Sequence, residues 1–137
     1  MSLFNVFDIS GSGMSSQALR MNLTASNMAN ANSVAGSEED AYKSRHPVFS
    51  AVMQDAFQGD GSTGVQSLGV VESNAAHEKR YQPEHPLADE EGYVYASNVN
   101  SVEEMANMIS ASRSYRNNIE VLNTSKRLLL ETLKLGE

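Results

Sequence analysis

The sequence has no cysteine, no tryptophan and only three prolines among its 137 residues. Without cysteine the chain can form no disulfide, no thiolate metal site and no cysteine nucleophile, and it could cross an oxidising compartment without mispaired thiols. No continuous apolar run approaches the ~18 residues of a membrane-spanning helix. The first residues, MSLFNVFDISGSGM, contain neither a basic segment nor a continuous apolar stretch, so we expect no cleaved secretory signal.

Charge is scarce in the N-terminal quarter of the chain. Residues 1–37 contain two charged side chains, Asp8 and Arg20, although 20% of the sequence is charged and about seven are expected in a stretch of this length. Acidic residues begin abruptly at Glu38. The formal net charge of −7 argues against a nucleic-acid backbone as the main partner.

Residues 1–33 have the pattern of one long assembly helix. Apolar and small side chains recur at alternating spacings of three and four with no proline between them, which is a heptad pattern. Gly11 and Gly13 each weaken a helix by about 1 kcal/mol, so the segment either has a hinge there or admits a second helix closely at Gly11 and Ala18. The expected contact stripe consists of Phe4, Phe7, Gly11, Met14, Ala18, Met21, Ala25 and Met28.

Residues 99–137 predict a second assembly helix. Ser101 and Glu104 have the spacing of a capping box, with Asn100 as the alternative cap. Acidic residues near the start and basic residues near the end suit the helix dipole. Its expected contact stripe consists of Met105, Met108, Ser112, Tyr115, Ile119, Leu122, Lys126, Leu129 and Leu133.

The middle segment, residues 34–98, predicts a small β-rich and extended insert. Strands are expected at 46–55 and 65–73, paired as a hairpin across the glycine-rich stretch QGDGSTG. Residues 81–98 predict an extended loop that turns at DEEG and ends in a short strand at GYVY. The expected fold is therefore mainly α with a small β insert, its two terminal helices paired as a coiled coil.

The stretch TASNMANANS, residues 24–33, is polar but carries no charge. Burying an ion is costly unless it is paired, whereas buried amides and hydroxyls need only a hydrogen-bond partner. We therefore expect the terminal helices to be covered by neighbouring subunits. The residues expected at such an interface are Phe4, Phe7, Met14, Met21, Asn27, Met28, Asn30, Asn32, Met105, Met108, Tyr115, Ile119, Leu122, Asn123, Leu129 and Leu133.

Motifs for catalysis or cofactor binding are absent from the sequence. The histidines, His46, His77 and His85, have no metal-ligand spacing, and no phosphate-binding loop or nucleophile elbow occurs. A hydrolase that uses His85 with Asp89 is one alternative, and it would require a pocket. We expect no enzyme activity, no cofactor, no metal, no nucleic acid and no small-molecule substrate.

Two segments carry a resemblance to a known family. SLFNVFDISGSGMSSQALRMNLTASNMANANS resembles the N-terminal segment of bacterial flagellar rod proteins, and its S-x-N-[LM]-A-N signature falls on Ser26, Asn27, Met28, Ala29 and Asn30, with Asn32 following. The segment from YQPEHPLADEEGYVY to the C-terminus is similar to the proximal rod member of that family. Its distinguishing residues are His85, Pro86, Asp89, Gly92, Tyr93 and Val94.

The resemblance implies a structural subunit of the proximal rod in the bacterial flagellar basal body. Such a subunit would be exported by the flagellar type III apparatus and would polymerise into a helical tube that transmits torque across the periplasm. Its partners would be other proximal and distal rod proteins, the rod–ring junction protein and the membrane-embedded ring. A free-standing coiled-coil adaptor or export chaperone is the alternative, and it would be a stable dimer with charged outer helix faces.

Overall fold

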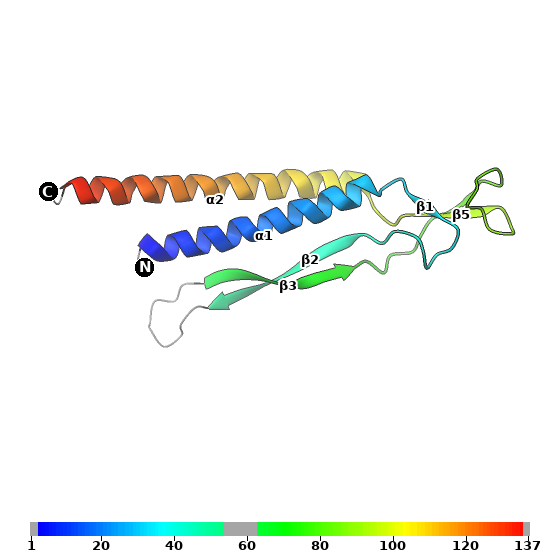
Figure 1. The fold of residues 1–137 in the computed structure, drawn as a ribbon, viewed down its shortest axis with the longest axis horizontal. Coiled ribbons are helices and arrows are strands. Elements are labelled where there is room, and N and C mark those ends of the chain that lie inside the picture. The colour runs from blue at the N-terminus through cyan, green and yellow to red at the C-terminus, as the bar shows by residue number, and fades with distance from the viewer. Residues whose placement is uncertain (1–2, 54–62, 136–137) are drawn as a thin grey trace.

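A computed structural model describes residues 3–53 and 63–135 of the chain. The elements follow in the order α1 (Leu3–Ala29), β1 (Val34–Ala35), β2 (Arg45–Met53), β3 (Thr63–Glu72), β4 (Lys79–Tyr81), β5 (Tyr93–Ala96) and α2 (Ser101–Leu135). Figure 1 shows an elongated molecule in which α2, α1 and the β2–β3 hairpin lie side by side along its length. The two helices run antiparallel, so the start of α1 and the end of α2 lie at one end of the molecule and β1, β4 and β5 at the other. The expected architecture, two terminal helices around a small β region, is confirmed.

Helix α1 is continuous through both glycines, so the hinge, one of the two alternatives left open by the sequence, does not occur. A Cβ added at Gly13 would lie 2.9 Å from the Nδ2 atom of Asn118 on α2, whereas one added at Gly11 would meet nothing within 4 Å. Gly13, and not Gly11, is therefore the point of close helix approach. The hydroxyls of Ser12 and Ser16 donate back to the carbonyls of Ile9 and Ser12, which satisfies them within the helix.

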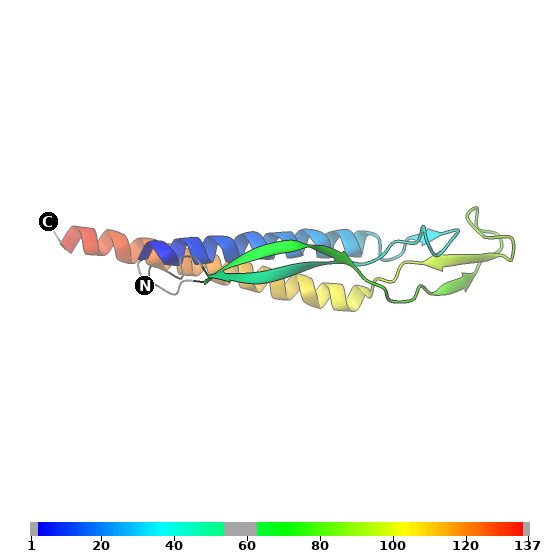
Figure 2. The same cartoon turned by 90° about the horizontal axis from the view of Figure 1, so that it is seen from below.

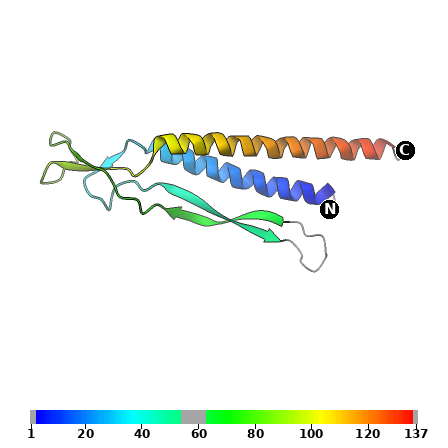
Figure 3. The ribbon, with the colours of Figure 1, turned by 180° about the vertical axis from the view of Figure 1, so that it is seen from behind.

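Helix α2 begins with Asn100 as its cap. The Asn100 Oδ1 atom accepts hydrogen bonds from the backbone N–H groups of Val102 and Glu103, at 3.1 and 3.3 Å. The capping box predicted at Ser101 is wrong, and the alternative at Asn100 is confirmed, because the Glu104 side chain turns instead toward α1. Figure 3 shows that α2 continues past the beginning of α1.

Strands β2 and β3 form the predicted antiparallel hairpin, with register from Arg45 opposite Glu72 to Met53 opposite Thr63. The register shifts between Val48, which pairs with Gly69, and Phe49, which pairs with Ser67, so Leu68 is the extra residue of a β-bulge. Gly69 has a φ of +150°, a conformation that favours glycine. Figure 2 shows the hairpin lying along the helix pair. The turn predicted between the strands falls largely in residues 54–62, outside the described residues.

A second sheet of strand order β1–β5–β4 forms the end of the molecule opposite the helix termini. The predicted turn at DEEG is confirmed, because the Asp89 Oδ1 atom accepts from the backbone N–H groups of Glu91 and Tyr93. Gly92 has a φ of +82°, and a Cβ there would lie 3.0 Å from the Tyr81 ring. Strands β1 and β4 were not expected, because two and three residues are too few to show an alternating pattern.

The interior of the described molecule is small and largely polar. Its buried apolar side chains are Ala41, Val94, Ala96 and Ala111, while buried polar ones include Ser10, Ser16, Thr24, Asn27, Glu104 and Ser125. On α1 the buried Ser10, Thr24 and Asn27 each precede by one residue the stripe position expected from the sequence, which corresponds to a rotation of about 100°. The predicted inward stripe is therefore wrong by one residue, and Met28 at its end is 36% exposed.

No helix within the described ranges is both long enough and apolar enough to cross a lipid bilayer.

Candidate assembly interface

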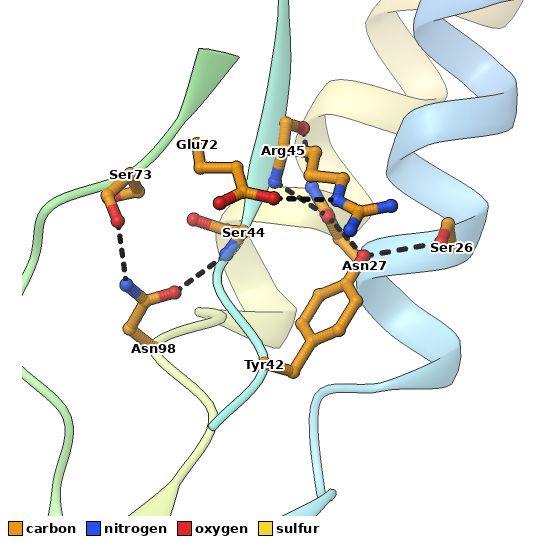
Figure 4. A network of polar contacts seen from close by, with 8 residues as sticks. All are labelled: Ser26, Asn27, Tyr42, Ser44, Arg45, Glu72, Ser73 and Asn98. Atoms are coloured by element: carbon orange, nitrogen blue, oxygen red, sulfur yellow. Dashed lines mark hydrogen bonds and ion pairs between the residues drawn. The ribbon is translucent and has the colours of Figure 1, made fainter. Parts of the chain in front are cut away.

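Asn27 lies where α1, β2, α2 and the segment before β2 meet, and its side chain is fully buried. Its Nδ2 group donates to the Arg45 carbonyl at 2.9 Å and to the Glu104 Oε2 atom at 3.1 Å. Its Oδ1 atom accepts from the Arg45 backbone N–H at 2.9 Å and from the Tyr42 hydroxyl at 3.0 Å. All four hydrogen bonds that an amide side chain can make are therefore made, as Figure 4 shows in part. We call Asn27, Tyr42, Arg45 and Glu104 the Asn27 network.

The Asn27 network is extended at the surface by Ser26 and Glu72. Because the Tyr42 hydroxyl donates its hydrogen to Asn27, the Ser26 hydroxyl must donate to Tyr42, over 3.2 Å. The Arg45 guanidinium lies over the Tyr42 ring, 5.7 Å from its centroid, and pairs with Glu72 at 3.3 Å. This ion pair is about half exposed and contributes at most about 1 kcal/mol, so the buried amide bonds hold the junction.

A second asparagine, Asn98, lies just after β5 and bonds to the two chain segments at the open end of the β2–β3 hairpin. Its Oδ1 atom accepts from the Ser44 backbone N–H at 2.7 Å, just before β2 (Figure 4). Its Nδ2 group donates to the carbonyls of Ser73 and Ala75, just after β3. The two asparagines therefore fix both the position of the hairpin on α1 and its connection to the end sheet.

The contact between α1 and α2 is made by polar and small side chains. The Arg20 guanidinium donates to the Asn107 Oδ1 atom at 2.8 Å, and on α1 Arg20 lies midway between Gly13 and Asn27, which contact Asn118 and Glu104. The three α1 positions, 13, 20 and 27, recur every seven residues. A seam of this kind buries little apolar surface, so it contributes little hydrophobic stabilisation to the isolated chain.

Many of the residues expected at a subunit interface lie at the surface of the chain. Met105 is 53% exposed and Leu133 63% exposed, and further exposed apolar side chains were not expected, among them Leu68 and Ile109. Asn27, in contrast, is fully buried and cannot contact a neighbour in this conformation. Of the rest, Phe7, Met14, Met21, Asn30, Met108, Tyr115, Leu122 and Leu129 are partly exposed, Met28, Asn32, Ile119 and Asn123 are exposed, and the Phe4 side chain lies outside the described part.

The side chains considered for catalysis have local structural roles. The His85 Nδ1 atom accepts from the Leu87 backbone N–H at 3.1 Å, and Asp89 forms the turn described above. Five open grooves on the described surface are lined by other residues, and neither His85 nor Asp89 is among them. Within residues 3–53 and 63–135, no three metal-binding side chains gather at one place.

Comparison with known proteins places the chain in a family. A family model described as "Flagella basal body rod protein" matches residues 7–36, and one described as "Flagellar basal body rod FlgEFG protein C-terminal" matches residues 90–135. The chain is 48% identical over 137 residues to the flagellar basal-body rod protein FlgC of Salmonella typhimurium, with 100% of both chains covered. The chain belongs to the FlgC family. The corresponding proteins of Yersinia enterocolitica and of Buchnera aphidicola subsp. Acyrthosiphon pisum are 47% and 38% identical, again with 100% of both chains covered.

Membership of the FlgC family makes the chain a structural subunit of the flagellar basal-body rod and not an enzyme. It assembles there with other components of the basal body. The resemblance identified from the sequence is thus confirmed at the level of the family. The match at residues 7–36 includes Asn27, and the match at residues 90–135 includes its partner Glu104, whereas Tyr42 and Arg45 lie between the two matched segments.

Sequence reasoning did not identify Tyr42, Arg45, Glu104 and Asn98 as the partners in these two networks. For Glu104 alone the sequence indicated a hydrogen-bonding role, through its spacing from Ser101. The partner predicted from that spacing was the start of α2, whereas the actual partner is Asn27. The two hydrogen bonds between Asn27 and Arg45 use the Arg45 main chain, and main-chain bonding depends on the fold and not on the residue type.

Proposed function

We propose that this chain is a subunit of the proximal rod, exported by the flagellar type III apparatus and polymerised into a helical tube that transmits torque. Membership of the FlgC family supports a place in the rod, and the exposed apolar side chains of the subunit support its polymerisation. The observation that carries the proposal is the inverted distribution of side chains. Polar groups such as Asn27 and Glu104 are buried, whereas Leu133 and other large apolar side chains face outward.

The accessible surface of the chain supports the same proposal. It amounts to 9348 Å², whereas a compact monomer of 14.9 kDa exposes roughly 7000 Å². A subunit with this much surface, much of it apolar, gains stability when neighbours cover it. The exposed asparagines of the expected interface, Asn32 and Asn123, could exchange hydrogen bonds with those neighbours without burying a charge.

The expected geometry of assembly is a heterologous contact, in which one patch meets a different patch on the next subunit. Such contacts build an open helix where the rotation does not close a ring. The neighbours would include other proximal and distal rod proteins, the rod–ring junction protein and the membrane-embedded ring. The terminal helices would form the inner wall of the tube and the 34–98 insert would face outward.

We also propose that α1 and α2 wind as a coiled coil within the rod. The contacts at Gly13, Arg20 and Asn27 are supporting observations, since a seven-residue repeat keeps a seam facing its partner along a supercoil.

In the free chain the helices are expected to be partly unfolded, because one polar seam offsets little of the entropy lost on ordering. This would suit export through a narrow channel and would prevent early polymerisation. Circular dichroism of the purified chain tests it, since a fully helical monomer with a cooperative melting transition would refute this part of the proposal.

Complementation in a motile bacterium that lacks its own copy of this subunit tests the main proposal. The wild-type chain should restore swimming and be found in purified basal bodies by immunoblot. A chain that stays outside basal bodies, and that sediments as a stable dimer, would instead support the adaptor alternative.

A further inference from the structure

Arg20 is the only lysine or arginine among residues 1–37, and it lies partly buried where α1, α2 and the β2–β3 hairpin meet. Its guanidinium donates to the neutral Asn107 Oδ1 atom at 2.8 Å. It has no carboxylate partner, since the two ion pairs within the described ranges use other arginines. A partly buried charge of this kind is poorly compensated by one neutral amide. Arg20 can therefore accept an anion from outside the chain.

One of the five surface grooves lies beside Arg20 and has a volume of about 200 Å³. We call it the Arg20 groove. This volume is below the roughly 300–1,000 Å³ of sites for cofactors and drug-sized ligands, so the groove suits a single small group. Its apolar wall consists of Pro47 and Phe49 on β2. Its polar lining contains no Asp or Glu and consists of Arg20, Thr24, Arg45, His46 and Asn107.

The polar lining offers hydrogen-bond donors that are not used within the described part of the chain. Because Arg20 can only donate, Asn107 presents its oxygen to Arg20 and keeps its NH2 group available. Thr24 is 4% exposed, and its hydroxyl bonds to no other described residue. The Arg45 Nε atom bonds to Glu72, whereas its two terminal amino groups make no hydrogen bond there. Unused donors beside two cations favour a ligand that is negatively charged and only accepts.

Two acids of the same chain contact or adjoin lining residues, but both have other partners. Glu72 bonds to Arg45 at 3.3 Å and is about half exposed. Glu104 lies one turn before Asn107 on α2, is 3% exposed and accepts from the Asn27 amide at 3.1 Å. Neither lines the Arg20 groove. The described chain therefore supplies cations to the groove without a carboxylate to match them.

From these observations we propose that the Arg20 groove binds an oxyanion of the size of a carboxylate or a phosphate group. Such a group matches the planar fork of a guanidinium, which can bond to two oxygens at once. Two sources could supply it, an acidic side chain of a neighbouring subunit or a free anion. The binding itself does not depend on the proposed function, whereas the first source rests on it, because the neighbour would belong to the rod polymer.

Inorganic phosphate tests the binding on the purified chain. Thermal unfolding is followed by circular dichroism in trimethylamine N-oxide, with sodium phosphate compared with sodium chloride at equal ionic strength. At about ten times its dissociation constant, phosphate should raise the melting temperature by roughly 3–5 °C, because it binds the folded chain. Arg20→Gln should abolish this rise. Arg113→Gln, the same change at an exposed position of α2, should retain it, which separates binding from a general salt effect.

Carbodiimide coupling tests the neighbouring subunit as the source, in purified basal bodies. The reagent joins a carboxylate to a lysine amine in contact with it, so Arg20→Lys places a reactive amine in the groove and keeps the charge. We expect a cross-linked product that is absent from the wild-type chain, in which mass spectrometry finds position 20 joined to an Asp or Glu of another subunit. Asn22→Lys, exposed on the same helix outside the groove, is the matched control and should give little of this product.

The outcomes separate the two sources from each other and from the proposed function. Coupling to another subunit identifies an acidic side chain, and a phosphate effect without coupling identifies a free anion. If position 20 is joined only to an acid of its own chain, the groove is neutralised internally and the inference is wrong. If there is neither a phosphate effect nor coupling, the groove holds only water and the inference is again wrong. If the wild-type chain is absent from basal bodies, the proposed function fails, and the phosphate measurement still decides the binding.

Discussion

The side-chain amide of Asn27 bonds to both the N–H and the C=O of Arg45, 18 residues further along the chain. A side chain of α1 thereby forms with β2 the reciprocal pair of bonds that a neighbouring strand would form. The hairpin is attached to the helix through its main chain, so this contact tolerates different side chains at position 45 but requires an amide at 27.

Asn27→Asp should disrupt this junction. The change removes both N–H donors and places a second carboxylate 3.1 Å from the Glu104 Oε2 atom, in a site that is fully buried. We expect a loss of about 3–5 kcal/mol in the free energy of unfolding. Thermal unfolding followed by circular dichroism, in trimethylamine N-oxide to favour the compact state, measures it. Asn22→Asp, exposed on the same helix, is the control, and equal losses in the two variants would contradict the role given to Asn27.

The glycines of α1 should respond differently to alanine. Gly11→Ala meets no atom within 4 Å and should stabilise the helix by about 0.5–1 kcal/mol. Gly13→Ala has the same intrinsic gain but forces the Asn118 amide to move, so its net gain should be smaller. Helix content of the two variants by circular dichroism compares them directly. A larger gain at Gly13 than at Gly11 would mean that the close approach to α2 is absent in solution.

Gly92→Ala should loosen the pairing of β4 with β5. Its positive φ strains any other residue, and the new Cβ would lie 3.0 Å from the Tyr81 ring and 3.2 Å from Pro83. We expect a loss of about 1–3 kcal/mol. The Tyr81 and Tyr93 rings meet edge to face at 5.2 Å, and with no tryptophan present the near-ultraviolet circular dichroism reports mainly on tyrosines. The signal should fall in Gly92→Ala and be retained in Glu91→Ala.

Leu133→Ser should weaken assembly and leave the fold of the chain intact. The side chain is 63% exposed, so the subunit loses little by its removal, whereas a covered leucine in the rod contributes about 1.5–3 kcal/mol. The amount of the variant in basal bodies should drop, with unchanged circular dichroism of the free chain. Thr124→Ala, an exposed change on the same helix, serves for comparison. If Leu133→Ser were present in basal bodies in the same amount as the wild-type chain, Leu133 would not be an interface residue.

The two helices and the longer strands could be predicted because each has a local signal, whereas β1 and β4 are too short to carry one. The periodicity of α1 and α2, and for β2 and β3 the β-prone composition on either side of a glycine-rich stretch, were sufficient to place them. The face that each helix buries was predicted wrongly on α1, because the largest side chains were assumed to point inward. In a subunit whose apolar residues face outward, Met28 marks the outer surface, and the adjacent Asn27 marks the interior.

The Asn27 network could be anticipated only in part. The uncharged polar composition of residues 24–33 suggested buried amides, and one of its three asparagines, Asn27, is buried, but by contacts within the chain and not by a neighbouring subunit. The amide content of a segment indicates that its side chains need hydrogen-bond partners, but it does not indicate where those partners lie. A carbonyl group of the same chain satisfies an amide as well as a carbonyl group of a neighbouring subunit does. The capping role of Asn100 was decided by a similar competition, since Glu104 had two possible partners and the nearer in sequence was not the one used.

The antiparallel helices bring the start of α1 and the end of α2 to one end of a long, narrow body, with the β4–β5 loop at the other. An epitope fused to either terminus would therefore mark the same pole of every subunit, and an epitope inserted between Gln82 and Gly92 would mark the opposite pole. Gold labelling of the two epitope-tagged proteins in isolated basal bodies would reveal which pole points toward the cell membrane, and hence the direction in which the subunit is laid down as the structure grows.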